Sequence, residues 1–320
     1  MMSMNALLDI KNLSVQFDTD EGRILAVNNI SLSLNAGEVL GIVGESGSGK
    51  SVTAKSIMQL NPDNTHYDET GEIIIDNENV LRFTSKEDLK KIRGGKVSMI
   101  FQEPMASFAP AIKIGKQMVE QLLLHKSINK EEAKSISIDM LKRVGIADAD
   151  KRFNQYAFEL SGGMRQRAMI AMALSTMPKL LLADEPTTAL DVTIQAQVLN
   201  LIKSIVKEYK MGVVFITHDL GVIAQTADYV AVMYLGCIVE SGPVREIIKN
   251  PKHPYTIGLL EALPDVNNLD VPLKPVPGNI PSPLERPSGC VFHTRCNLYE
   301  EGKCNIELPE LKNYSVNHQV

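Results

Sequence analysis

Residues 39–51 read Val-Leu-Gly-Ile-Val-Gly-Glu-Ser-Gly-Ser-Gly-Lys-Ser, and this stretch decides the fold. The uncharged run Val39–Val43 predicts a buried parallel strand, and the small residues after Ser51 suit the start of a helix. Between them, residues 44–51 fit the pattern G-x-x-x-x-G-K-[ST], in which a glycine-rich loop surrounds phosphate oxygens. The stretch therefore predicts a nucleotide-binding strand, loop and helix.

The chemistry of this loop assigns a different role to each kind of residue. The glycines allow backbone N–H groups to face inward as an anion-binding nest, and the helix N-terminus adds partial positive charge. Lys50 would reach the β- and γ-phosphates, and the Ser51 hydroxyl would bind Mg²⁺. The residues expected around the nucleotide are Gly44, Ser46, Gly47, Gly49, Lys50, Ser51 and Val52.

Length and composition limit the class of protein. The chain has 320 residues, which predicts about two domains, and its 44% hydrophobic and 22% charged residues are ordinary for a globular protein. A net charge of −5 offers no basic footprint for nucleic acid. The sequence shows no apolar run long enough to span a membrane and no secretory signal. We therefore expect a cytosolic protein whose cysteines are thiols or metal ligands.

The segments around the loop predict an α/β fold with an antiparallel β subdomain. Alternating residues predict strands over 7–17 and 30–34, and Phe17, at the end of the first, could stack on adenine or pack as an edge-strand aromatic. Ser85 is a candidate N-cap for a helix over 84–92. Gln102 follows a strand over 97–101, at the sheet edge where ligands bind, although a surface glutamine is the simpler interpretation.

Residues 103–178 change to helical periodicity and predict a helical subdomain inserted in the α/β domain. Helices are expected over 114–125 and 130–144, the second with Asn129 as N-cap. Ser161, Gly162 and Gly163 open another helix. Two glycines in a first turn cost about 1 kcal/mol each relative to alanine, so we favour a second anion site there.

Two later strands end in polar residues that suit phosphate chemistry. Asp184 and Glu185 follow a buried strand over 179–183, where Asp184 would contact the Mg²⁺ shell and Glu185 would deprotonate an attacking water. His218 follows a strand over 213–216, and its neutral imidazole could bind the γ-phosphate. A loop histidine with no such role is the alternative. Further helices and strands through residue 249 close the domain.

Together these motifs resemble the nucleotide-binding subunits of ABC transporters, with Leu160–Arg167 as the most specific match. The resemblance implies a head-to-tail dimer that holds two ATP molecules, each between the Walker A loop of one subunit and the signature residues of the other. It assigns Phe17 to the adenine-stacking A-loop and Gln102 to the Q-loop, which joins metal binding to the membrane subunits. Asp184 and Glu185 become the Walker B pair, residues 189–191 with Asp191 the D-loop, and His218 the switch histidine.

The tail after residue 250 narrows the resemblance. Nine of the sixteen prolines fall within 251–287, which predicts an extended, weakly structured segment. His253-Pro-Tyr-Thr and Gly289-Cys-Val-Phe-His-Thr-Arg-Cys296 are similar to the tails of oligopeptide/dipeptide importer ATPases. We therefore divide the chain into an ATPase domain over 1–250 and a tail over 251–320.

Members of that group often carry four tail cysteines that hold an iron–sulfur cluster. Cys290, Cys296 and Cys304 match three of them, Cys237 belongs to a core strand, and the fourth would be expected just beyond Val320. Three thiolates in a short cytosolic segment favour a cluster. Zinc bound with His293 or His318 and three unliganded thiols are the alternatives.

The resemblance implies an ATPase that powers import of peptides or related solutes, nickel included. It places the chain on the cytoplasmic face of the cell membrane, with a second ATPase subunit (a paralogue or the same chain), two membrane-spanning permease subunits and an extracytoplasmic solute-binding protein. The alternative is a soluble ABC ATPase acting on DNA or ribosomes. One cassette, a compact helical block and negative charge favour the importer without nucleic acid.

Overall fold

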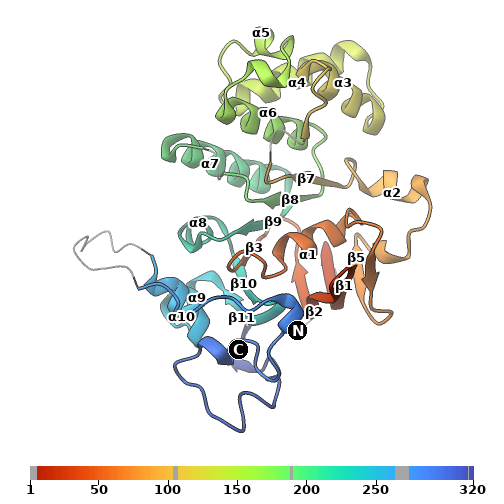
Figure 1. Cartoon of the computed structure of the whole chain (residues 1–320). Coiled ribbons are helices and arrows are strands. Elements are labelled where there is room, and N and C mark those ends of the chain that lie inside the picture. The colour runs from red at the N-terminus through yellow and green to blue at the C-terminus, as the bar shows by residue number, and fades with distance from the viewer. Residues whose placement is uncertain (1–5, 104–106, 188–189, 264–273, 316) are drawn as a thin grey trace. The chain divides into compact units, whose positions relative to one another are not determined.

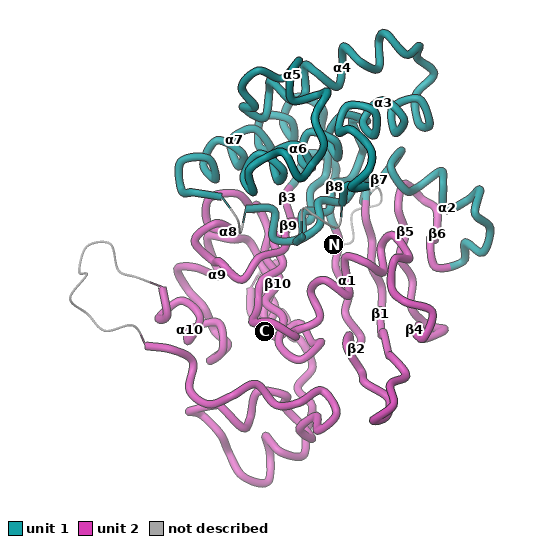
Figure 2. The backbone as a smooth tube through the Cα atoms, turned by 45° about the horizontal axis from the view of Figure 1, so that its top comes forward, with its two compact units in different colours: residues 1–7, 34–38, 82–214 teal, residues 8–33, 39–81, 215–320 magenta. Residues whose placement is uncertain are grey.

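A computed structural model describes residues 6–103, 107–187, 190–263, 274–315 and 317–320. The chain divides into two compact units, which Figure 2 distinguishes by colour. One unit contains residues 1–7, 34–38 and 82–214, and the other contains residues 8–33, 39–81 and 215–320. Each unit therefore combines segments that are far apart in the sequence, and we describe each in turn.

The second unit contains an antiparallel sheet built on the long strand β1 (Leu8–Thr19). Its strand order is β2-β1-β5-β6, with β4 paired to β1, and Figure 1 shows it beside the first helix, α1 (Lys50–Ile57). The other strands are β2 (Gly22–Leu34), β4 (Thr65–Tyr67), β5 (Glu72–Ile75) and β6 (Glu78–Asn79). The sheet confirms the expected antiparallel β subdomain.

The β1–β2 hairpin is longer than the sequence predicts. The expected strand over 30–34 starts instead at Gly22. Asn29 takes a positive φ of 49° and its N–H bonds the Ser14 hydroxyl at 2.9 Å, so a side chain satisfies this backbone group within the strand.

A second sheet of the same unit positions the glycine-rich loop. Its order is β12-β13-β11-β10-β3, and β10 runs parallel to β3 with Val230 opposite Gly41. Helix α8 covers β3 closely, since a Cβ on Gly41 would lie 2.8 Å from Ile223. The elements are β3 (Val39–Val43), α8 (Leu220–Thr226), β10 (Tyr229–Tyr234), β11 (Cys237–Pro243), α9 (Val244–Lys249), β12 (Asn313–Ser315) and β13 (His318–Gln319).

The first unit carries the strand ends before Gln102 and Asp184, whereas β9 (Gly212–Thr217) begins in this unit and ends in the other. Strands β9, β8 and β7 lie side by side, and β8 pairs with β7 in parallel, with Ala183 opposite Ile100. Ser85 caps α2 as predicted, accepting a hydrogen bond from the Asp88 N–H. The elements are a 3-10 turn (Val80–Arg82) leading into α2 (Lys86–Ile92), then β7 (Val97–Ile100), β8 (Leu180–Asp184), α7 (Val192–Tyr209) and β9 (Gly212–Thr217).

Helices fill the described part of residues 107–178, where the sequence predicts them. Figure 1 shows α3, α4, α5 and α6 grouped together. Packing between α3 and α5 is tight, since a Cβ on Gly115 would lie 2.4 Å from the Phe153 ring. Asn129 forms a capping box with Glu132 at the start of α4. The helices are α3 (Ile114–His125), α4 (Lys130–Arg143), α5 (Ala149–Phe153), a 3-10 turn (Ala157–Glu159) and α6 (Gly162–Ser175).

The tail departs from the extended segment that its prolines predict. Residues 254–261 form helix α10 (Pro254–Glu261), and short 3-10 turns follow at Pro283–Glu285 and His293–Arg295. The helix forms because Pro254 occupies its first turn, where proline is well tolerated, and the His253 ring caps it by accepting from the Tyr255 N–H. The prediction of an extended segment was therefore wrong for residues 254–261, because the position of a proline within an element matters more than the number of prolines.

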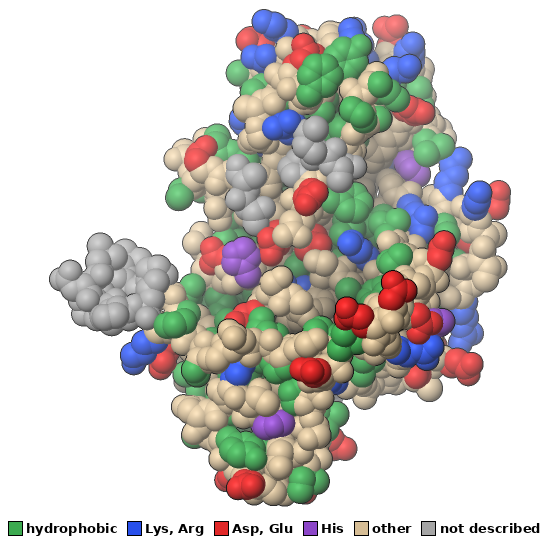
Figure 3. All heavy atoms as spheres, in the orientation of Figure 1, with side chains coloured by type: hydrophobic (Ala, Val, Ile, Leu, Met, Phe, Trp, Pro, Cys, Tyr) green, Lys and Arg blue, Asp and Glu red, His purple; other side chains and the backbone are tan. Residues whose placement is uncertain are grey.

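Two surface properties bear on partners. Across the described ranges, no helix combines the length and apolarity needed to cross a bilayer. On the face shown in Figure 3, basic and acidic side chains are interspersed rather than segregated. This mixed distribution accords with the net charge of −5.

Candidate functional site

Close packing around the 44–51 loop requires glycine at positions 44 and 49. Strand β3 is fully buried, and a Cβ on Gly44 would lie 2.2 Å from the Met233 carbonyl oxygen. Gly49 has a φ of 99°, and its Cβ would lie 2.6 Å from the Ala26 carbonyl oxygen. Side chains at these two positions would displace the loop, so both glycines are steric requirements.

The end of the loop has the form of an anion site. Gly49 is the N-cap of α1 in a left-handed conformation, and no side chain caps the helix there. The first turn of α1 contains no acidic residue, while Ser46 and Gly47 are exposed. A helix N-terminus without a side-chain cap or an acidic residue in its first turn can bind a phosphate through its backbone N–H groups. Ser51 and Val52 lie half-buried in that first turn.

The Lys50 ammonium lies over the loop. Its Nζ donates to the carbonyl oxygens of Gly44 and Glu45, both at 2.8 Å, and to the Ser48 hydroxyl at 3.2 Å. The residue is only 6% exposed. These contacts hold the cation beside the nest, where it can meet a phosphate.

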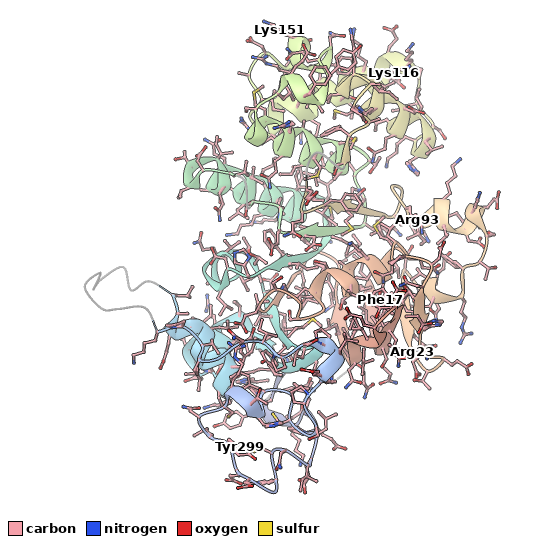
Figure 4. The ribbon with its side chains drawn as sticks, viewed as in Figure 1. Phe17, Arg23, Arg93, Lys116, Lys151 and Tyr299 are labelled. Atoms are coloured by element: carbon pink, nitrogen blue, oxygen red, sulfur yellow. The ribbon has the colours of Figure 1, made fainter. Side chains whose placement is uncertain are left out.

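Phe17 lies half-buried near the end of β1, opposite Thr65 of β4. The next residue, Asp18, accepts hydrogen bonds from Arg23 at 2.7 Å and from the His66 ring. These two hydrogen bonds lower the pKa of Asp18 below its ordinary value. Figure 4 shows Phe17 and Arg23 in the same sheet. The Asp18 contacts fix the end of the strand that presents Phe17.

His218 is exposed immediately after β9. The flanking residues hold this turn in place. The Asp219 carboxylate caps α8 by accepting from the Gly221 N–H at 2.7 Å, and the Asp219 N–H donates to the Thr217 hydroxyl at 3.0 Å. The structure thus presents the imidazole on a well-defined turn at the carboxyl end of a strand.

In the other unit, the two carboxylates after β8 occupy different environments. Asp184 is 3% exposed at the strand end, whereas Glu185 is half-buried with a positive φ of 47°. This φ is uncommon for a residue other than glycine. The two neighbouring carboxylates thus differ in burial and backbone conformation, and their two roles stay predictions.

The structure brings Gln102 and Glu185 together. The Gln102 Nε2 donates to the Glu185 Oε2 at 3.1 Å, because β7 and β8 are parallel neighbours and both chains leave the sheet at the same edge. This contact confirms that the two residues share one edge. Their roles toward nucleotide and metal stay predictions.

The signature residues form a capped helix start. The Ser161 hydroxyl accepts from the Met164 N–H at 3.3 Å, and Ser161 and Gly162 are exposed. A Cβ on Gly162 would meet nothing within 4 Å, and one on Gly163 would lie 3.6 Å from Leu190. Packing within this chain therefore does not require either glycine, in contrast to Gly44 and Gly49. Space kept clear at a helix N-terminus favours the approach of an external group.

Asp191 has a local structural role in addition to its predicted one. Its carboxylate caps α7 by accepting from the Ile194 N–H at 3.0 Å. Residue 189 of the predicted D-loop lies outside the described residues.

The three tail cysteines share one module of the second unit. The Cys290 N–H donates to the Cys304 carbonyl at 2.8 Å. Burial, followed by the nearby Cys296 and Cys304 thiols, raises the pKa of Cys290, which favours its neutral form. Among the described residues, no three His, Cys, Asp or Glu side chains form a group that could hold a metal ion. The conformation therefore does not present a ready cluster site.

The structure does not favour His318 as a zinc ligand either. The His318 Nε2 lies 2.8 Å from the Glu240 carboxylate, and both side chains are buried. That imidazole already has a partner in the fold.

Sequence reasoning missed residues that contact the glycine-rich loop from the tail. Arg295 forms an ion pair with Glu45 at 2.7 Å, and the Tyr255 hydroxyl accepts from the Glu45 N–H at 2.8 Å. The available signal was small: a carboxylate within the loop and an arginine between two cysteines of the tail motif.

Comparisons with known proteins identify the family. The ABC transporter family profile matches residues 27–188, and a profile described as the oligopeptide/dipeptide transporter C-terminal region matches residues 239–304. The chain is 47% identical over 312 residues to the oligopeptide transport ATP-binding protein OppD of Haemophilus influenzae, covering 98% of this chain and 95% of that protein. It is 48% identical over 295 residues to the dipeptide transport ATP-binding protein DppD of Lactococcus lactis subsp. cremoris, covering 92% and 84%.

Solved structures lead to the same family. The chain is similar to the dimeric ATP-binding cassette MJ0796 in a post-hydrolysis state bound to ADP and phosphate, with a TM-score of 0.68 and 29% identity. That match covers 74% of this chain and 99% of the cassette. Sequence and structure together place the chain in the ABC transporter family of ATP-binding proteins, in its oligopeptide/dipeptide group.

Proposed function

We propose that this chain is the ATP-hydrolysing subunit of an ABC importer for oligopeptides, dipeptides or related solutes. The observation that carries the ATPase activity is the loop over 44–51, whose helix N-terminus lacks a side-chain cap and whose Lys50 ammonium lies beside it. The match of the tail to the oligopeptide/dipeptide C-terminal region supports the class of solute.

Each site residue has a role in this proposal. The loop N–H groups, Lys50 and Ser51 bind the ATP phosphates and Mg²⁺, while Phe17 stacks on adenine. Glu185 takes a proton from the attacking water as the β–γ phosphoanhydride bond breaks to give ADP and phosphate. Gln102 and Asp184 contact the metal, and His218 contacts the γ-phosphate. Ser161, Gly162 and Gly163 bind the γ-phosphate held by a second subunit, and Asp191 lines that dimer interface.

A substitution at Gly162 separates folding from assembly. Because a Cβ there meets nothing within this chain, Gly162→Ala should leave the free energy of unfolding unchanged or raise it by up to about 1 kcal/mol, the helix preference of alanine over glycine. ATP turnover should fall at least about tenfold, equivalent to about 1.4 kcal/mol of transition-state stabilisation. Urea unfolding and a phosphate-release assay measure both. Unchanged turnover in a folded variant contradicts a γ-phosphate contact through Gly162.

Dimer formation predicts a dependence on concentration. With the phosphate loop on one subunit and the signature on another, a monomer should bind ATP yet hydrolyse it poorly. Turnover per subunit should therefore fall on dilution below the dimer dissociation constant, with nucleotide binding retained. Steady-state rates over a thousandfold dilution series test this expectation. Total turnover strictly proportional to protein concentration at every dilution argues against a shared site.

Partners and location complete the proposal. The chain would act on the cytoplasmic face of the cell membrane with two permease subunits, a second ATPase subunit and an extracytoplasmic solute-binding protein. Copurification of the tagged chain with permease subunits from solubilised membranes tests this assembly. Copurification with ribosomes or DNA instead would support the soluble ABC ATPase alternative.

We also propose that Cys290, Cys296 and Cys304 bind an iron–sulfur cluster, which we favour over zinc. Its support is the proximity of the thiols, since Cys296 and Cys304 both act on the pKa of Cys290. The side chains would have to move to ligate a metal, because the described conformation forms no such group. Anaerobic purification with iron and zinc analysis and a visible spectrum decides between cluster, zinc and free thiols.

A further inference from the structure

One tail residue, Arg295, reaches the phosphate loop with its whole guanidinium. Its Nη1 lies 2.7 Å from the Glu45 Oε2, and its Nη2 donates to the Glu45 Oε1 at 3.2 Å. The Arg295 side chain is 3% exposed and that of Glu45 27% exposed. A bidentate pair of this kind fixes both distance and orientation.

The other donors of Arg295 anchor it to two further segments. Nε donates to the Pro277 carbonyl at 2.7 Å and Nη2 to the Val276 carbonyl at 3.3 Å. Nη1 also reaches the Tyr234 hydroxyl at 3.4 Å, at the end of β10. Burial disfavours the charge, but hydrogen bonds from Arg295 to Glu45 and Tyr234 raise the Arg295 pKa overall. Arg295 is thus a buried side chain that connects several segments of the unit, rather than a surface side chain.

A second tail residue holds the backbone of Glu45. The Tyr255 hydroxyl accepts from the Glu45 N–H at 2.8 Å. Its fully buried ring lies 4.8 Å from that of Tyr234 and 5.4 Å from that of Phe292. This aromatic packing fixes the hydroxyl in place. Glu45 is therefore held by the tail through both its side chain and its main chain.

The remaining polar group of Glu45 faces the catalytic cation. Its carbonyl oxygen accepts from the Lys50 Nζ at 2.8 Å. A continuous set of contacts thus runs from Arg295 and Tyr255 through Glu45 to Lys50. Movement of Glu45 would displace the carbonyl that holds the ammonium beside the phosphate nest.

We propose that the C-terminal segment is a positioning element of the phosphate loop: Arg295 and Tyr255 fix Glu45 and, through it, Lys50. This inference rests on the proposed ATPase function. It means that docking of the tail and binding of nucleotide are coupled, and coupling of binding free energies is reciprocal. Nucleotide should therefore tighten the tail by the same factor by which the tail tightens nucleotide.

The test uses the full chain and MgADP, which binds the loop without turnover. Glu45→Gln keeps the size of the side chain, and Arg295→Met keeps its stem; each should raise the MgADP dissociation constant about tenfold, an ordinary coupling factor. The double variant should match the singles, because the two residues act as a unit. Lys303→Met is the matched control, since Lys303 pairs with Glu300 on the exposed surface of the same module, and it should stay within about twofold.

A second measurement needs no substitution. In the parent chain, saturating MgADP should slow protease cleavage and hydrogen exchange of residues 274–304 at least about fivefold. Glu45→Gln should abolish that protection. If Arg295→Met fails to fold, Glu45→Gln and the parent decide the outcome.

The outcomes separate the two proposals. A parent that binds MgADP, with variants that bind it equally well and a tail indifferent to nucleotide, overturns the positioning role alone. A folded parent that binds no MgADP overturns the ATPase function and the inference with it. Weakened binding together with lost protection supports the inference.

Discussion

Glu185→Gln should lower ATP turnover by about 10²–10⁴-fold, the usual contribution of a general base, while ATP binding persists. The amide cannot take the proton of the attacking water. Its oxygen can still accept from the Gln102 Nε2, which contacts Glu185 at 3.1 Å in the parent, so the local structure should survive. Turnover by phosphate release and dimerisation by size-exclusion chromatography with MgATP measure the two effects. The variant should accumulate as an ATP-bound dimer.

The matched control is Glu208→Gln, which removes an exposed charge from α7. It should keep parental turnover. If Glu185→Gln retains more than about a tenth of parental turnover, less than 1.4 kcal/mol of barrier is attributable to this carboxylate, and the base must be sought elsewhere.

A second large effect is expected on stability, at the buried Glu240 carboxylate. Its Oε1 accepts from the Lys252 N–H and lies 2.8 Å from the His318 Nε2, and its Oε2 accepts from the His253 N–H at 3.0 Å. Glu240→Ala leaves a buried imidazole and two N–H groups without an acceptor. Breaking a buried pair in this way costs about 3–5 kcal/mol. Urea unfolding should report the loss as a lower midpoint.

Two further variants serve as references for the loss of stability in Glu240→Ala. Glu301→Ala, at an exposed tail position, should change stability by less than about 0.5 kcal/mol. Glu240→Gln retains one carbonyl acceptor and should lie between the two. A loss below about 1 kcal/mol for Glu240→Ala would mean that the tail contributes little to the cooperative unfolding unit.

Local sequence patterns were enough for much of the fold. The helices predicted over 114–125 and 130–144 are present, the second with its Asn129 cap, and the strands that precede Gln102, Asp184 and His218 are also present. These elements are short-range: a cap, a period of 3.6 residues or an apolar run is visible within a dozen residues.

The differences come from context that such patterns omit. The strand predicted over 30–34 begins at Gly22, and within it the Asn29 N–H bonds the Ser14 hydroxyl on the neighbouring strand. Prolines after residue 250 suggested an extended segment, yet Pro254 occupies a first turn that accepts it. Each outcome depends on where one residue falls within an element.

The candidate site divides in the same way. Gly44–Ser51, the carboxylates after β8 and the signature serine are recognisable because each is a contiguous motif. The contact of Glu45 with Arg295 is not, because 250 positions separate the two residues, and neither motif indicates that it meets the other. That separation explains why the sequence pattern predicted a role for Lys50 but not the residues that hold it.

That separation also has a consequence for biosynthesis. Ribosomes add about 5–20 residues per second, so Glu45 is made roughly 12–50 s before Arg295, 250 positions later. During this interval the nascent chain contains every residue of the phosphate loop but not the arginine that meets its carboxylate. The loop can therefore reach its final form only after Arg295 has been made, and a message cut short before codon 295 would yield a phosphate loop without the arginine that holds Glu45.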